Sequence, residues 1–194
     1  MSTSHPINPS VNRLARPRMR VVMFAILVCS GTTWSQAAPA SGTVPARAAA
    51  PCVNDPERHR FDFWIGKWTV TTKTGAVAGN SVIESVSGGC ALLENWTSLS
   101  GGHGKSLNAY NPRTRQWQQY WIGQDGAVSE FRTSEFKDGN MIFFIKDESK
   151  PRSIVRLTFT PLDSATVRQH SESSSDGGRS WTTQYDFYYH RKAA

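Results

Sequence analysis

The chain has 194 residues, of which 38% are hydrophobic and 19% charged, and this composition is typical of one globular domain with short additions. The formal net charge is +7, but four of the 22 Lys and Arg residues and none of the 15 Asp and Glu residues fall within residues 1–37. The remainder has 18 basic against 15 acidic residues and no basic cluster interleaved with aromatic residues, so we do not expect it to bind nucleic acid.

Residues 1–37 have the pattern of a secretory signal peptide. A basic stretch, Arg13–Arg20, precedes the apolar run Val21–Cys29, which is too short to span a bilayer comfortably. Small residues follow, so we predict cleavage near Ala37 and a secreted or periplasmic bacterial protein without membrane association after cleavage. An uncleaved membrane anchor is the alternative. Met19 is a candidate start site, because the chain from there makes a compact signal peptide.

Residues 38–51 are rich in Ala and Pro and predict a disordered lead-in. The folded domain is expected over residues 52–194. It retains two cysteines, Cys52 and Cys90. In an oxidising compartment such a pair predicts a disulfide, which would close a loop of about 39 residues. Two buried thiols are the alternative.

Short segments rich in β-branched and aromatic residues follow one another through the domain, separated by turn residues such as Asp125-Gly126. They predict the strands Trp68–Lys73, Ser81–Ser87, Ala91–Leu99, Lys105–Tyr110, Gln116–Ile122, Ala127–Ser134, Met141–Lys146, Ile154–Thr160, Thr166–Ser173 and Trp181–His190.

The predicted fold class is all-β. We expect an antiparallel up-and-down meander of about eight to ten strands, closed into a lipocalin-like barrel because closure hides the sheet edges. A short N-terminal helical turn is expected within Glu57–Ile65. A sandwich is the alternative architecture.

The stretch from Ser174 to Trp181 fits the Asp-box pattern, Ser-x-Asp-x-Gly-x-Ser-Trp, which recurs in sialidases and other β-propellers. A propeller needs several repeats of about 40 residues, and the chain has no second copy. Asp176 and the neighbouring glycines suit a tight turn between two strands. The motif therefore predicts a hairpin turn and not a sialidase.

The domain opens with Phe61-Asp62-Phe63-Trp64-Ile65-Gly66-Lys67-Trp68. Its Gly-x-Trp resembles the first strand of lipocalins and related calycins, in which the Trp closes the barrel floor and packs against a basic residue of the last strand, here Arg191 or Lys192. The whole stretch from Cys52 to Arg191 resembles an uncharacterised secreted bacterial family with a lipocalin-like domain of unknown function. The resemblance implies a fold rather than an activity.

Strand alternation groups aromatic and hydrogen-bonding side chains on common faces. Inward faces of this composition would make a small-molecule pocket. In the alternative, the polar groups face solvent and the aromatic rings belong to the core. The candidate ligand-binding residues from these faces are Glu94, Trp96, Asn108, Tyr110, Gln119 and Trp121.

Arg168 shares a face with His170 and Glu172 and is a further candidate, since a guanidinium suits an anionic ligand group. A solvated row of cross-strand charges is about as good an interpretation. The histidines after residue 37 have no ligand-like spacing, so we predict neither a metal site nor a cofactor.

We therefore hypothesise a secreted or periplasmic protein that binds a small, partly apolar ligand in its barrel, without catalysis. One alternative is an enzyme on the same barrel with Glu94 or Glu172 as acid or base. Another is an envelope protein that acts through its surface and binds no ligand. The sequence leaves the oligomeric state open.

Overall fold

The computed structural model describes residues 52–146 and 149–193. The signal peptide and the lead-in that the sequence predicts lie outside these residues. Within the described residues, no helix is long and apolar enough to cross a membrane. The strands are β1 (Gly66–Thr72), β2 (Val77–Val86), β3 (Ala91–Ser98), β4 (His103–Asn111), β5 (Gln116–Gly123), β6 (Val128–Phe131), β7 (Thr133–Lys137), β8 (Asn140–Lys146), β9 (Ile154–Pro161), β10 (Thr166–Ser174) and β11 (Thr182–Arg191).

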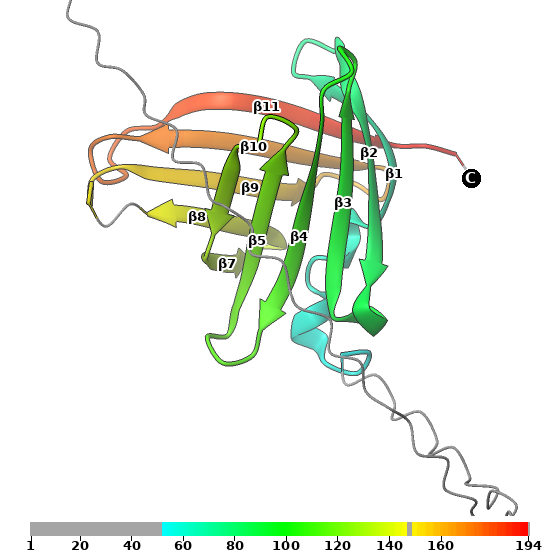
Figure 1. Cartoon of the computed structure of the whole chain (residues 1–194), viewed down its shortest axis with the longest axis horizontal. Helices are drawn as coiled ribbons and strands as arrows, with labels where there is room; N and C mark the ends of the chain where they lie inside the picture. The colour runs from blue at the N-terminus through cyan, green and yellow to red at the C-terminus, as the bar shows by residue number, and fades with distance from the viewer. Residues whose placement is uncertain (1–51, 147–148, 194) are drawn as a thin grey trace, which may run out of the picture. The chain divides into compact units, whose positions relative to one another are not determined.

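The strands form one antiparallel sheet of eleven strands that curls into a nearly closed barrel (Figure 1). Almost every strand pairs with its neighbours in the chain, and β1 also pairs with β11, which joins the two halves of the meander. The ends of the sheet are β6 and β7. The expected all-β barrel is thus confirmed, with one strand more than the upper expectation.

The additional strand arises because the segment predicted as one strand, Ala127–Ser134, is divided at Arg132 into β6 and β7. No main-chain ladder joins these two strands in the described sheet. We call this junction between β6 and β7 the seam. Two side chains of β5 bind beside it: the Gln118 amide donates to the Arg132 carbonyl, and the Ser134 N–H donates to the Gln116 side-chain oxygen. No Gly, Pro, Asn or Asp stands between Val128 and Lys137, so turn residues gave no sign of the break.

A buried aromatic cluster fills one end of the barrel. Phe61 lies at its centre and stacks on Trp64 with ring centroids 5.0 Å apart, and its ring lies 4.9 Å from that of Phe159. Trp117 and Phe143 also pack edge-on or tilted against Phe61. Burial of such large rings supplies most of the hydrophobic stabilisation of a small domain, so this end is a packed core.

The segment before β1 covers this end of the barrel, beside the turns from β2 to β3 and from β4 to β5 (Figure 1). It contains two short 3₁₀ turns, η1 (Pro56–His59) and η2 (Asp62–Trp64), where the sequence predicted one helical turn. The Glu57 carbonyl accepts a hydrogen bond from the Trp117 indole N–H at 2.9 Å.

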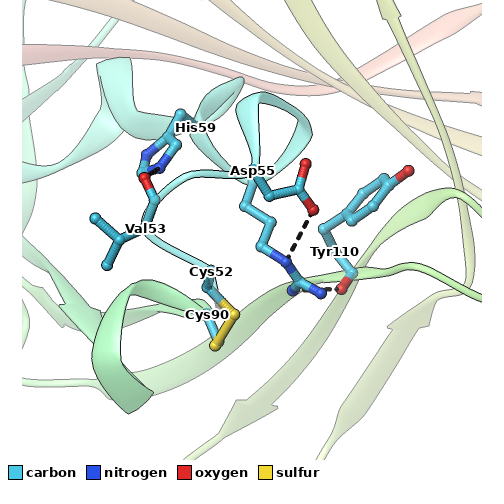
Figure 2. The surroundings of a disulfide bond; sticks show 7 residues. Cys52, Val53, Asp55, His59, Cys90 and Tyr110 are labelled. Carbon is cyan, nitrogen blue, oxygen red and sulfur yellow. Dashed lines mark hydrogen bonds and ion pairs between the residues drawn. A yellow bond between two sulfur atoms is a disulfide. The ribbon is translucent and has the colours of Figure 1, made fainter. Parts of the chain in front are cut away.

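The disulfide Cys52–Cys90 ties this covering segment to the start of β3 (Figure 2). The two Cα atoms are 5.0 Å apart, within the range that a disulfide requires. Arg58 reinforces the same junction, because it pairs with Asp55 and donates to the Tyr110 carbonyl of β4. The predicted pairing of the two cysteines is therefore confirmed.

Trp68, from the Gly-x-Trp of β1, belongs to the buried core. Trp68 is fully buried, and the Arg191 guanidinium from the end of β11 lies over its ring, 4.2 Å from the centroid. Gly66 has a φ of 147°, which favours glycine, and a Cβ at this position would lie 2.4 Å from the Arg191 Nη1 atom, so the guanidinium would have to shift. Of the two basic residues proposed for this contact, Arg191 makes it.

The Asp-box forms the turn between β10 and β11, as the sequence predicted. The Asp176 carboxylate accepts hydrogen bonds from the main-chain N–H groups of Arg179 and Ser180 and from the Ser180 hydroxyl. These donors hold the pKa of Asp176 well below its ordinary value. Gly177 and Gly178 have φ values of 81° and 90°, which favour glycine. All these contacts are local to the hairpin.

Candidate ligand-binding cavity

Each long strand contributes inward-facing residues at successive depths of the barrel, because side chains on a strand alternate between two faces. On β5, Trp117 packs in the closed end, Gln119 lies above it and Trp121 lies higher still. The same order on β3 runs from buried Leu92 through Glu94 to Trp96. The apolar core therefore gives way to a polar layer, and the polar layer to an upper aromatic layer.

A cavity of about 410 Å³ occupies the upper two layers, and its volume lies in the range of small-molecule sites. Seven strands contribute the described residues of its wall, which is apolar over most of its surface. The described lining residues are Glu94, Trp96, Gln119, Trp121, Ser129, Phe131, Ile145, Val155, Gln169, Ser171, Tyr185, Phe187 and Tyr189.

The polar lining groups lie deeper than most of the apolar ones. Glu94 and Gln119 are only 3% and 5% exposed, and Gln169 is similarly buried. In contrast, Trp96 and Trp121 are half-buried. A ligand that entered would therefore meet aromatic walls first and hydrogen-bonding groups at the floor. The alternative interpretation, in which Glu94 and Gln119 face solvent, is wrong.

Glu94 is the centre of a hydrogen-bond network on this floor. Its Oε1 atom accepts from the Ser81 hydroxyl at 3.0 Å, and its Oε2 atom accepts from the Ser106 hydroxyl at 2.9 Å. The Tyr189 hydroxyl lies 3.3 Å from Oε1 and 2.8 Å from the Gln169 side-chain oxygen, to which it donates. Hydroxyl groups from β2, β4 and β11 thus meet at one carboxyl group of β3, and Gln169 of β10 joins the network through Tyr189.

A directed chain of donors reaches Glu94 from β5. The Gln119 amide donates to the Asn108 oxygen at 2.7 Å, and the Asn108 amide donates to the Ser106 hydroxyl at 2.9 Å. Ser106 in turn donates to Glu94. Since hydrogen bonds of one direction polarise one another, this chain fixes the orientations of the Asn108 and Gln119 amides.

Burial raises the pKa of Glu94 to about 7, because removing the carboxylate from water disfavours its charged form. The three hydroxyl donors act in the opposite direction and limit the rise. Glu94 can therefore exchange a proton near neutral pH. Burial also raises the pKa of Tyr185 to about 12 and that of Tyr189 well above its ordinary value, so both phenols stay neutral.

Two glycines determine where the indoles of the upper layer lie. A Cβ at Gly104 would lie 2.4 Å from the Trp121 ring, and one at Gly79 would lie 2.9 Å from the Trp96 ring. Both glycines are buried on the strands next to these tryptophans. Their lack of a side chain lets each indole lie across the neighbouring strand. The Trp96 ring also stacks on Phe187 of β11, with ring centroids 6.0 Å apart.

The structure brings together four of the seven residues predicted for the site: Glu94, Trp96, Gln119 and Trp121 line the cavity. Asn108 is fully buried and reaches the cavity only through its hydrogen bonds. Tyr110 points inward as expected but belongs to the aromatic core at the closed end, where it packs against Trp117.

Arg168 has to be removed from the site. Its inward neighbours on β10 are Val167 and Gln169, so Arg168 projects to the outer face. There its guanidinium makes two hydrogen bonds, of 2.7 and 2.8 Å, to the Asp186 carboxylate. The alternative interpretation, a row of cross-strand charges, describes this face correctly. Glu172 lies on the same face and pairs with Arg156 at 2.8 Å.

Sequence reasoning missed nine of the thirteen described lining residues. Tyr185, Phe187 and Tyr189 alternate along β11, and this aromatic period-2 pattern was a usable signal. Ile145 and Val155 gave no comparable signal, because any half-buried strand carries such residues. Within the described part of the chain, no group of His, Cys, Asp and Glu residues could hold a metal ion.

Models of known protein families and curated proteins were compared with this chain, and none of them matches it.

Proposed function

We propose that this protein binds a small, partly apolar molecule in the barrel cavity. The observation that carries the proposal is the layered wall: a buried polar floor around Glu94 beneath a half-buried aromatic rim. A packed barrel would gain stability from an apolar residue at position 94, whereas a binding site needs a few convergent polar groups in an apolar wall.

We further propose that the protein is secreted or periplasmic. The disulfide Cys52–Cys90 supports this proposal, because such bonds persist in oxidising compartments. The signal-peptide pattern of residues 1–37 supports it independently. The stacking of Arg191 on Trp68 likewise supports the proposed relationship to lipocalin-like proteins.

Binding is favoured over catalysis on the same barrel because the cavity offers one acid and not two. Glu172, the second acid considered, is paired with Arg156 on the outer face. Among the described lining residues, only Glu94 carries a carboxyl group. Two-carboxylate acid–base chemistry would need a second one within reach.

Native mass spectrometry of the protein purified from its own periplasm tests the proposal. We expect a bound molecule in the native protein and its loss in Val155→Trp, which fills the cavity rim. Val128→Trp is the matched control, because Val128 is exposed on β6 and does not line the cavity. Retention of the molecule by Val155→Trp would contradict the proposal. So would a native protein that is purified without a bound molecule and binds no compound in a metabolite screen.

A further inference from the structure

We infer that the cavity takes a primary or substituted amine, with the protonated nitrogen at Glu94 and an apolar, preferably aromatic, body between the tryptophans. This inference rests on the proposed function and names the ligand class for the same site.

The first reason is the charge of the wall. Among the described lining residues, Glu94 is the one that ionises near neutral pH, and none is Lys, Arg or His. The nearby phenols of Tyr185 and Tyr189 stay neutral. A carboxylate or phosphate ligand would therefore be buried beside Glu94 without a cation, and an unpaired buried charge is costly. An ammonium group would supply the missing partner.

The second reason is the hydrogen-bonding capacity of Glu94. A carboxylate has about four acceptor positions, and the hydroxyls of Ser81 and Ser106 occupy two of them. The Tyr189 hydroxyl lies 3.3 Å from Oε1 but donates to Gln169, so at least one acceptor position remains for a donor from the cavity. The side-chain amides of Gln119 and Gln169 line the same floor, and their oxygens are acceptors as well. An ammonium group offers three donors and no acceptor, which matches a floor rich in oxygen atoms.

The third reason is the aromatic rim. The faces of indole, phenol and phenyl rings are negative and attract cations, most strongly when water is excluded. Phe187 stacks on both Trp96 and Tyr185, with centroids 6.0 and 5.0 Å away, and so forms a continuous aromatic wall. Trp121 and Phe131 also line the cavity. An ammonium-bearing ligand gains from these faces as well as from Glu94, whereas an anionic ligand is repelled by both.

The groups around Glu94 are neutral, so the charge of a bound ligand would determine whether Glu94 keeps its proton. Its neighbours are the hydroxyls of Ser81 on β2, Ser106 on β4 and Tyr189 on β11. The amides of Gln119 on β5 and Gln169 on β10 are connected to Glu94 only through other members of the network. A bound ammonium would favour the ionised form of Glu94, so the carboxyl would release its proton on binding. Amine affinity should therefore rise between pH 6 and pH 8, while the affinity for a neutral analogue should not.

Isothermal titration calorimetry with three probes of similar size tests the inference: 2-phenylethylamine, 2-phenylethanol and phenylacetate. At pH 8 we expect the amine to bind about tenfold more tightly than the alcohol, a factor that corresponds to about 1.4 kcal/mol, and phenylacetate to bind weakest. Glu94→Gln should bring the amine and the alcohol to similar affinities. Glu94→Asp, which keeps the charge, should retain the preference and serves if the Gln variant does not fold.

Several results would overturn the amine inference: phenylacetate binding as tightly as the amine, an amine preference that survives Glu94→Gln, or no binding of any probe. If all three probes bind equally and Val155→Trp abolishes their binding, the proposed binding function is supported and the proposed ligand class is wrong. If no probe binds, the native mass spectrum alone decides the proposed function.

Discussion

Glu94 makes the stability of the protein depend on pH in the direction opposite to that of most carboxyl groups. Its pKa is about 7 in the folded protein and 4.5 in an ordinary environment. Between these values the folded state binds a proton that the unfolded chain does not, so the free energy of unfolding falls as pH rises. The loss accumulates from about pH 4.5 to pH 7 and reaches roughly 3 kcal/mol above pH 7.

We therefore expect Glu94→Gln, which has almost the same shape and no charge, to be more stable than the native protein at pH 8 and similar to it at pH 4.5. Urea unfolding across this pH range measures the difference between the two proteins. The difference isolates Glu94, because His59, whose pKa is raised chiefly by its hydrogen bond to Asp62, is present in both. Parallel pH profiles would show that Glu94 does not titrate in this range.

At the scale of residues, the sequence predicted those parts of the site that follow from side-chain alternation within a single strand. Glu94 with Trp96, and Gln119 with Trp121, fall on common faces whatever the tertiary fold, and both pairs line the cavity. Alternation does not say which face is inward, so Arg168 was placed on the wrong side of β10. Nor does it give depth along the barrel axis, which is why Tyr110 lies in the core below the cavity.

At the scale of elements, the strands were predictable because turn residues separate them, and the one miss lies where no turn residue stands. Arg132 separates β6 from β7 within a segment that contains no turn residue. The Asp-box was interpretable for the converse reason, since its glycines and carboxylate specify a local turn. Local chemistry thus determines hairpins, whereas sheet closure at a corner depends on contacts distant in sequence.

The disulfide holds one element, the segment before β1, onto the closed end of the barrel. It joins residues 38 positions apart, for which the chain-entropy model gives a stabilisation of roughly 4 kcal/mol. We expect the double variant Cys52→Ser/Cys90→Ser to lose about this much free energy of unfolding in oxidising buffer.

Guanidinium unfolding of the oxidised native protein, the reduced native protein and the double variant measures this loss. The reduced protein is the control, because it lacks the bond but keeps both sulfur atoms, and it should resemble the variant. Equal stability of the oxidised protein and the variant would mean that the contacts of Arg58 and Trp117 hold the segment without the bond.

At the scale of the whole barrel, the seam between β6 and β7 is the weakest joint of the described sheet. Every other neighbouring pair of strands in the described sheet is joined by a main-chain ladder, including β1 and β11. The two seam strands have only four and five residues, and each has a ladder on one side alone. Regions with few buried hydrogen bonds open at low free-energy cost.

We therefore expect hydrogen exchange, followed by mass spectrometry, to be fastest among the strands in residues 128–137 and slowest in β1, β10 and β11. Ser129 and Phe131 of β6 line the cavity, so a ligand bound there would contact one of the two seam strands directly. Because a ligand that binds only the closed barrel stabilises it by mass action, saturation with ligand should slow exchange in β6 more than in β1. Uniform exchange across all strands would mean that the seam is as stable as the laddered joints. Protection that rises equally everywhere would place the ligand away from β6.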